Sequence, residues 1–142
     1  MRKLLLILTA AAAPLAAQDS PVGFEAARFT PLTLGQWSYT PTATGSEARF
    51  AGSLLIRCDR NVRRVTLRRT EPVIGPASAM IITTDLATNT VPADGSVANT
   101  NRLLDAIAFS RGRFLISGGG SALQLVVPSS PEAARTIEDC RN

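Results

Sequence analysis

Apolar and polar residues alternate along residues 47–69, and this period of two restricts that part of the chain to β-strands. Residues 47–58 are predicted to form one strand and residues 62–69 a second. The tripeptide Asp59-Arg60-Asn61 between them is typical of a turn. We therefore expect an antiparallel hairpin whose apolar face lies in the core. On the first strand this face carries Phe50, Gly52, Leu54, Ile56 and Cys58.

The turn also predicts how the two strands pair. A two-residue loop at residues 60–61 sets Ile56 opposite Val65, so that apolar side chains meet. A three-residue loop would set Ile56 opposite Arg64 instead. We expect the two-residue loop, which places Arg57 directly opposite Arg64 on the outer face.

The remaining elements are predicted from similar signals. Trp37 and Tyr39 share one face of a short strand, where they are expected to be core anchors. Thr100 can cap a short helix, and Ser130-Pro131 is a typical start for a C-terminal helix that ends near residue 140. The sequence predicts a mainly β chain, an antiparallel sandwich or open barrel with one short internal helix and a C-terminal helix. Further strands are expected at residues 80–84, 88–91, 113–117 and 122–127.

The N-terminus is typical of a secretory signal peptide. Two basic residues are followed by about ten apolar residues and by the small-residue cleavage site Pro14-Leu15-Ala16-Ala17. The apolar run is shorter than the roughly 20 residues that a membrane-spanning helix needs. We expect residues 1–17 to be removed, residues 18–35 to form an irregular lead-in, and residues 36–142 to form one β-rich domain. The mature protein is expected to be periplasmic or secreted, without a transmembrane span.

The chain has two cysteines, Cys58 and Cys140. Export brings them into an oxidising compartment, where a pair of cysteines favours a disulfide. Cys58 lies on the apolar face of its predicted strand, and Cys140 lies on the apolar stripe of the last helix, three residues after Ile137. Both sulfur atoms are therefore expected to point inward and to form a bond.

Arginines gather in the central hairpin, and three of them are candidate residues for binding an anion or a partner. The predicted register places Arg57, Arg64 and Arg68 on the outer face. Because like charges that face each other are destabilising, either acidic side chains neutralise this face or it receives an anion. The anion would belong to an acidic protein or to an anionic envelope component, such as a phosphorylated lipid headgroup or a polyanionic glycan.

The residue types exclude several functions. The chain has no histidine, and its only lysine, Lys3, lies in the expected signal peptide, so histidine nucleophiles, histidine metal ligands and Schiff bases are excluded. The glycine run at residues 117–121 lacks the lysine and the helix of a phosphate loop and predicts a hairpin turn. Aromatic residues, at 5%, do not interleave with the arginines, so no nucleic acid partner is expected. We expect no catalytic residue, no cofactor and no metal site.

The tail of the chain, with the segments Ala108-Phe109-Ser110-Arg111-Gly112-Arg113-Phe114 and Pro131-Glu132-Ala133-Ala134-Arg135-Thr136-Ile137-Glu138-Asp139-Cys140-Arg141, resembles small uncharacterised exported proteins of sphingomonad-type alphaproteobacteria. The resemblance covers about the last ninety residues and includes the Cys58 strand. It implies a periplasmic or secreted location and no particular activity. The Cys58 strand with a terminal helix ending in Cys140 is also faintly similar to type VI secretion accessory proteins and to invasion-associated-locus-B-like periplasmic proteins.

These observations favour an exported, non-enzymatic binding or accessory module. Two alternatives stay open: a structural or stress-related envelope protein without a small ligand, and a hydrolase that uses carboxylates. The acidic residues are scattered along the chain and have structural interpretations as turn formers or helix-surface residues, which does not favour the hydrolase.

Overall fold

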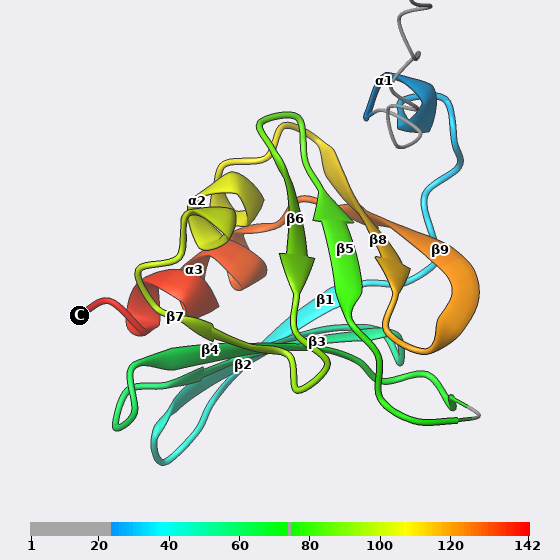
Figure 1. Ribbon diagram of the computed structural model, residues 1–142. Coiled ribbons are helices and arrows are strands. Elements are labelled where there is room, and N and C mark those ends of the chain that lie inside the picture. The colour runs from blue at the N-terminus through cyan, green and yellow to red at the C-terminus, as the bar shows by residue number, and fades with distance from the viewer. Residues whose placement is uncertain (1–23, 74) are drawn as a thin grey trace, which may run out of the picture.

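The computed structural model describes residues 24–73 and 75–142, so the expected signal peptide lies outside the described residues. Figure 1 shows two antiparallel sheets, with α2 and α3 together at one side and α1 apart from them. The first sheet has the order β1-β2-β3-β4-β7 and the second has the order β6-β5-β8-β9. The prediction of a mainly β fold with a C-terminal helix is therefore confirmed, and of the two architectures expected, the sandwich-like one is found. The strands are β1 (Trp37–Pro41), β2 (Gly45–Phe50), β3 (Leu54–Asp59), β4 (Arg64–Arg69), β5 (Met80–Thr83), β6 (Thr88–Val91), β7 (Ser96–Ala98), β8 (Arg113–Gly118) and β9 (Ser121–Pro128).

Three helices complete the fold: α1 (Phe24–Ala27), α2 (Arg102–Ala108) and α3 (Pro131–Asp139). The C-terminal helix begins as predicted, because Ser130 caps it by accepting a hydrogen bond from the backbone N–H of Glu132. The cap of α2 is Asn101 and not Thr100, since the Asn101 side chain accepts from the backbone N–H of Leu103. Within the lead-in expected to be irregular, the structure has the short helix α1.

The segment at residues 47–58 is two strands and not one. It turns at residues 51–53, where Ala51 adopts a left-handed φ of 47° and Gly52 is exposed. β2 then pairs with β3 so that Phe50 lies opposite Leu54. Gly52 therefore does not belong to the core face. The alternation misled the prediction because both arms of the hairpin keep the same inward and outward pattern on either side of a tight turn.

The predicted register between β3 and β4 is wrong by two residues. Ile56 lies opposite Leu67 and Cys58 lies opposite Val65. The strands are joined by residues 60–63, with Arg63 in a left-handed conformation at φ 53°. A shift of two keeps every side chain on its predicted face, because side chains alternate with a period of two. Val65 is thus buried as predicted, whereas the cross-strand partners change.

The core lies between the two sheets and is also lined by side chains of α2 and α3. Trp37 packs on Phe50 and Phe114 from the two sheets, with ring centroids 5.5 and 6.4 Å apart, and this confirms its place as a core anchor. The helix α3 packs against the inner face of the first sheet at β1, β2 and β3. This leaves the opposite face of that sheet outside the core. The largest fully buried side chains are those of Phe50, Phe114, Leu54, Ile56, Leu67, Ile82, Leu103, Leu104, Ile116, Ile137, Val65 and Val91.

Cys58 and Cys140 form a disulfide, as predicted. Their Cα atoms lie 5.3 Å apart, and both residues are at most 3% exposed. The bond ties α3 to the inner face of β3. Near it, the hydroxyls of Tyr39 and Ser46 donate hydrogen bonds of 2.6 and 2.7 Å to Oδ2 of Asp139, so a second, polar connection holds the same helix to β1 and β2.

None of the helices in residues 24–73 and 75–142 is long and apolar enough to span a bilayer.

Candidate functional site

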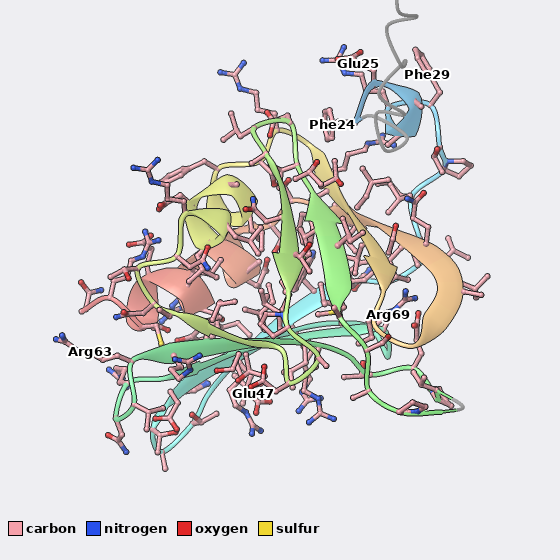
Figure 2. All side chains as sticks on the ribbon, in the orientation of Figure 1. Phe24, Glu25, Phe29, Glu47, Arg63 and Arg69 are labelled. Carbon is pink, nitrogen blue, oxygen red and sulfur yellow. A yellow bond between two sulfur atoms is a disulfide. The ribbon has the colours of Figure 1, made fainter. Side chains whose placement is uncertain are left out.

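Four arginines lie on the outer face of the first sheet, the side turned away from the helices. Arg57 comes from β3, Arg64 and Arg68 come from β4, and all three are exposed as predicted. Arg49 of β2 joins them, although the sequence analysis did not single it out. No helix or strand of the described residues covers this side of the sheet (Figures 1 and 2). We call Arg49, Arg57, Arg64 and Arg68 the arginine face.

The observed register removes the predicted clash between like charges. Arg57 does not lie opposite Arg64: it lies opposite Glu47 on one side and Thr66 on the other. Arg64 lies opposite Asp59 and Ala98. Thr66 therefore stands beside Arg57 on β4, where a second guanidinium was expected, and the carboxylate of Glu47 lies on the opposite side, on β2. The hypothesis of an anion-binding face rested on the opposition of Arg57 and Arg64, and the structure does not contain that opposition.

Glu47 is the central carboxylate of the arginine face and is only 7% exposed. Its Oε1 accepts a hydrogen bond of 2.5 Å from Nε of Arg57, and its Oε2 accepts bonds of 3.1 and 2.8 Å from Nε and Nη2 of Arg49. Burial alone raises the pKa of Glu47, and it is the largest single influence. The hydrogen bonds and positive charges of Arg57 and Arg49 together outweigh it and lower the pKa below the ordinary value. Glu47 is therefore ionised at neutral pH.

The shared carboxylate positions two guanidinium groups without covering them. The bonds to Glu47 use Nε and Nη2 of Arg49 and Arg57, which leaves the Nη1 side of each group turned away from that carboxylate. The side chains of Arg49 and Arg57 stay 48% and 52% exposed. A planar guanidinium with a free edge is suited to binding a phosphate or carboxylate through two parallel hydrogen bonds.

The two arginines that β4 contributes to the arginine face, Arg64 and Arg68, have no carboxylate partner among the described residues. Arg64 donates to Oγ and to the backbone oxygen of Ser96 on β7, at 2.5 and 3.3 Å. Arg68 makes no ion pair within the described parts of the chain. With Glu47 and Asp59 as the acidic residues of this side of the sheet, the arginine face keeps a net positive charge.

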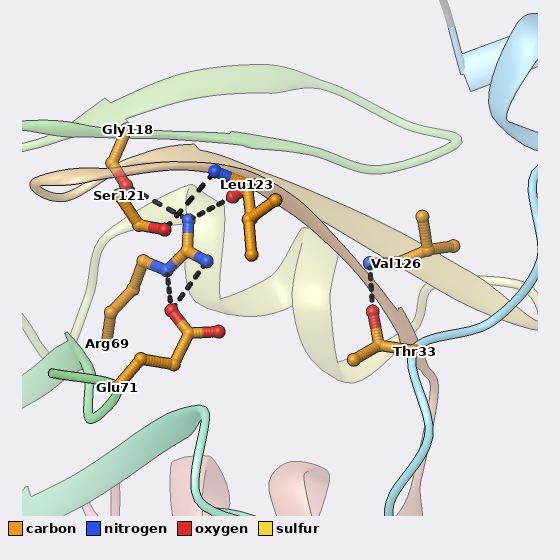
Figure 3. A network of polar contacts seen from close by, with 7 residues as sticks. All are labelled: Thr33, Arg69, Glu71, Gly118, Ser121, Leu123 and Val126. Atoms are coloured by element: carbon orange, nitrogen blue, oxygen red, sulfur yellow. Dashed lines mark hydrogen bonds and ion pairs between the residues drawn. The ribbon is translucent and has the colours of Figure 1, made fainter.

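The neighbouring Arg69 belongs to a different environment. It points toward the inside, with a side chain only 1% exposed, and its Nη1 donates to the backbone oxygens of Gly118 and Leu123 at 3.1 and 2.6 Å. Its Nε donates to Oε2 of Glu71 at 2.8 Å (Figure 3). Arg69 therefore holds the second sheet to the first and is not available to a ligand.

The other candidates from the sequence, the glycine run and Tyr39, have structural roles. The glycine run is a tight hairpin turn, with Gly119 and Gly120 at φ values of 69° and 85°, as predicted. Tyr39 stacks under the guanidinium of Arg135, whose Cζ lies 4.2 Å from the ring centre, and it bonds Asp139. Within the described residues no three histidine, cysteine or acidic side chains gather in a way that could hold a metal ion.

Comparison of the chain with protein-family models, with curated proteins and with solved structures finds no match.

Proposed function

We propose that this chain is an exported binding or accessory module, and that the arginine face is where it binds an anionic partner. The observation that carries the proposal is the arginine face itself. Four exposed arginines stand on a sheet surface that no described element covers, and Arg49 and Arg57 are held in place by one buried carboxylate. Holding guanidinium groups in a fixed geometry lowers the conformational entropy that is lost when they bind an anion.

An ordinary solvated sheet surface does not require this arrangement. Arg49 and Arg57 are about half exposed, so their two pairs with Glu47 contribute about 0–1 kcal/mol each, no more than about 2 kcal/mol together, against the cost of taking a carboxylate out of water. On a binding face the same carboxylate has a purpose, because it orients two guanidinium groups and relieves their mutual repulsion in the free protein. The proposal therefore assigns to Glu47 a positioning role and to the four arginines the contact with the partner.

The test is binding to soluble polyanions, with polyglutamate and polyphosphate chains as probes in a low-salt titration. The variant Arg64→Glu/Arg68→Glu should lose most of the binding, and the wild-type affinity should fall steeply as salt rises, because exposed charges are screened over about 8 Å at physiological ionic strength. The control away from the arginine face is Arg111→Glu, an exposed arginine in the loop between α2 and β8. Equal binding by the double variant and the wild type would overturn the proposal.

Export is tested separately. The chain is expressed with its own N-terminus in a Gram-negative host, and the cell is fractionated. A product in the periplasm or the medium whose first residue is Gln18, or a neighbour within two residues of it, agrees with the predicted cleavage. An uncleaved product that stays in the cytoplasm would contradict the export part of the proposal.

A further inference from the structure

We infer that the anionic partner is the phosphate-bearing surface of a lipid bilayer, and that the tip of the β3–β4 hairpin inserts Val62 among the headgroups. This inference rests on the proposed function and names the partner of the same site. It depends on two observations that the proposed function does not use: the shape of the arginine face and the structure of the hairpin tip.

The charges of the arginine face spread in two dimensions. In register across three strands, Arg49 of β2 and Arg68 of β4 flank Leu55 of β3. Arg57 lies two residues further along β3, and Arg64 lies four residues from Arg68 on β4. Neighbouring strands are about 4.8 Å apart and a step of two residues is about 6.7 Å, so the four Cα atoms cover an area about 10 by 13 Å.

This spread favours a surface over a single extended chain as the partner. An acidic peptide in an extended conformation presents its carboxylates along one line and would meet one row of arginines at a time. A bilayer with anionic lipids presents phosphates over a whole plane, and each basic residue near it adds attraction independently. Leu55 is only 7% exposed between Arg49 and Arg68, which indicates that their aliphatic stems cover it.

The hairpin tip lies next to Arg64 at one end of the arginine face and carries an exposed aliphatic side chain. Residues 60–63 are all exposed, and Val62 keeps 61% of its surface accessible. One exposed valine has no meaning by itself. The position of Val62 makes its exposure significant here, because Val62 lies between Arg60 and Arg63 and two residues before Arg64. Figure 2 shows Arg63 at this tip, at the end of the sheet.

The tip is held rigidly, which makes it suited to insertion. The backbone N–H of Arg60 donates to the oxygen of Thr44, that of Asn61 donates to Oδ1 of Asp59, and that of Asn99 donates to the oxygen of Arg63, at distances from 2.9 to 3.1 Å. The exposed position of Val62 is therefore built into the fold, and its insertion requires no ordering of a loose loop.

The experiment is co-sedimentation with vesicles, using the exported and processed protein at low salt. Vesicles of phosphatidylglycerol and phosphatidylcholine are compared with vesicles of phosphatidylcholine alone. The wild type should bind the anionic vesicles and not the neutral ones. Arg64→Glu/Arg68→Glu should weaken partitioning by about 100-fold or more, because each charge near an anionic surface is worth about a factor of five. The control Arg111→Glu should bind far more tightly than the double variant.

Substitutions at Val62 give a second test, because they change the apolar contribution to vesicle binding and leave the charge unchanged. Val62→Ser should weaken vesicle binding by about 3- to 10-fold, and Val62→Leu should strengthen it, because apolar burial stabilises the inserted state. Neither variant should change binding to soluble polyglutamate. Equal vesicle binding by the wild type, Val62→Ser and Val62→Leu would overturn the inference. Circular dichroism and thermal unfolding establish that each variant is folded before it is compared.

The outcomes separate this inference from the proposed function. Binding to polyglutamate without binding to anionic vesicles would overturn the bilayer as partner and leave the proposed function in place, with an acidic protein as its partner. Saturable binding of inorganic phosphate that abolishes vesicle binding at millimolar concentration would indicate a site for free phosphate and would also overturn the inference. Failure to bind any of these probes would overturn both.

Discussion

Nη1 of Arg69 donates a hydrogen bond of 2.6 Å to the backbone oxygen of Leu123, and this contact joins the first sheet to the second. The same atom reaches the oxygen of Gly118, and Glu71, two residues after the end of β4, balances the charge (Figure 3). A guanidinium that is this deeply buried is tolerated only because its partners are fixed around it.

Replacing Arg69 should therefore destabilise the protein far more than replacing its exposed neighbour. We expect Arg69→Met to lower the free energy of unfolding by about 3 kcal/mol, because two backbone oxygens lose their donor and Glu71 loses its counter-charge. Arg68→Met, on the outer side of the same strand, should change it by about 0.5 kcal/mol or less. Urea unfolding of both variants checks this, and equal effects would show that Arg69 does not connect the sheets energetically.

The disulfide should contribute a large part of the free energy of unfolding. Cys58 and Cys140 are separated by 82 positions, and closing a loop of this length restricts the unfolded chain by roughly 4–5 kcal/mol in the chain-entropy model. We expect Cys58→Ala/Cys140→Ala to lose about 2–5 kcal/mol. Intact mass before and after reduction establishes the bond in the wild type. A native sample whose thiols alkylate fully without reductant would contradict it.

The sequence predicts the faces of this fold better than its pairings. Inward and outward positions of β3 and β4 follow from alternation alone, so Val65 and Arg64 are placed correctly. The pairing between the strands depends on the conformation of the loop, and the left-handed Arg63 that lengthens it to four residues has no signal in the residue type. The turn at Ala51 was missed for the same reason, because a left-handed alanine is rare.

The candidate site was predicted in part. Exposure of Arg57, Arg64 and Arg68 follows from the period of two. The part played by Glu47 does not, because it depends on which strand lies beside β3. Once residues 47–58 are divided into two strands, Glu47 faces Arg57 across the hairpin, and Arg49 follows on the same side. The glycine of Ala51-Gly52-Ser53 was the one signal that could have suggested the division.

Tyr39 should stabilise the fold through its hydroxyl as well as through its ring. Burial, the largest influence, raises the pKa of Asp139, and the hydrogen bonds of Tyr39 and Ser46, with the charges of Arg135 and Arg60, lower it further than burial raises it. Tyr39→Phe keeps the ring under Arg135 and removes one donor to an ionised acceptor. We expect a loss of about 1–2 kcal/mol in the free energy of unfolding, measured by denaturant titration at neutral pH. An unchanged value would mean that water replaces the hydroxyl at no cost.

The lowered pKa of Glu47 predicts how stability depends on pH. A carboxyl group whose pKa is lower in the folded state than in the unfolded state stabilises the fold fully above its unfolded value, here near the ordinary 4.5. The contribution disappears as pH falls from there through the folded pKa, since the protonated carboxyl no longer attracts Arg49 and Arg57. Glu47→Gln removes this contribution at every pH.

We therefore expect Glu47→Gln to be less stable than the wild type by about 1–2 kcal/mol at pH 7. The two proteins should converge in stability as the pH falls below about 4.5, because protonation of Glu47 then removes from the wild type the charge that the variant lacks. Thermal unfolding at a series of pH values measures both curves. Glu25→Gln, at an exposed pair on α1, is the control and should run parallel to the wild type. A constant gap between wild type and Glu47→Gln down to the lowest pH would show that the carboxylate charge does not hold the two arginines.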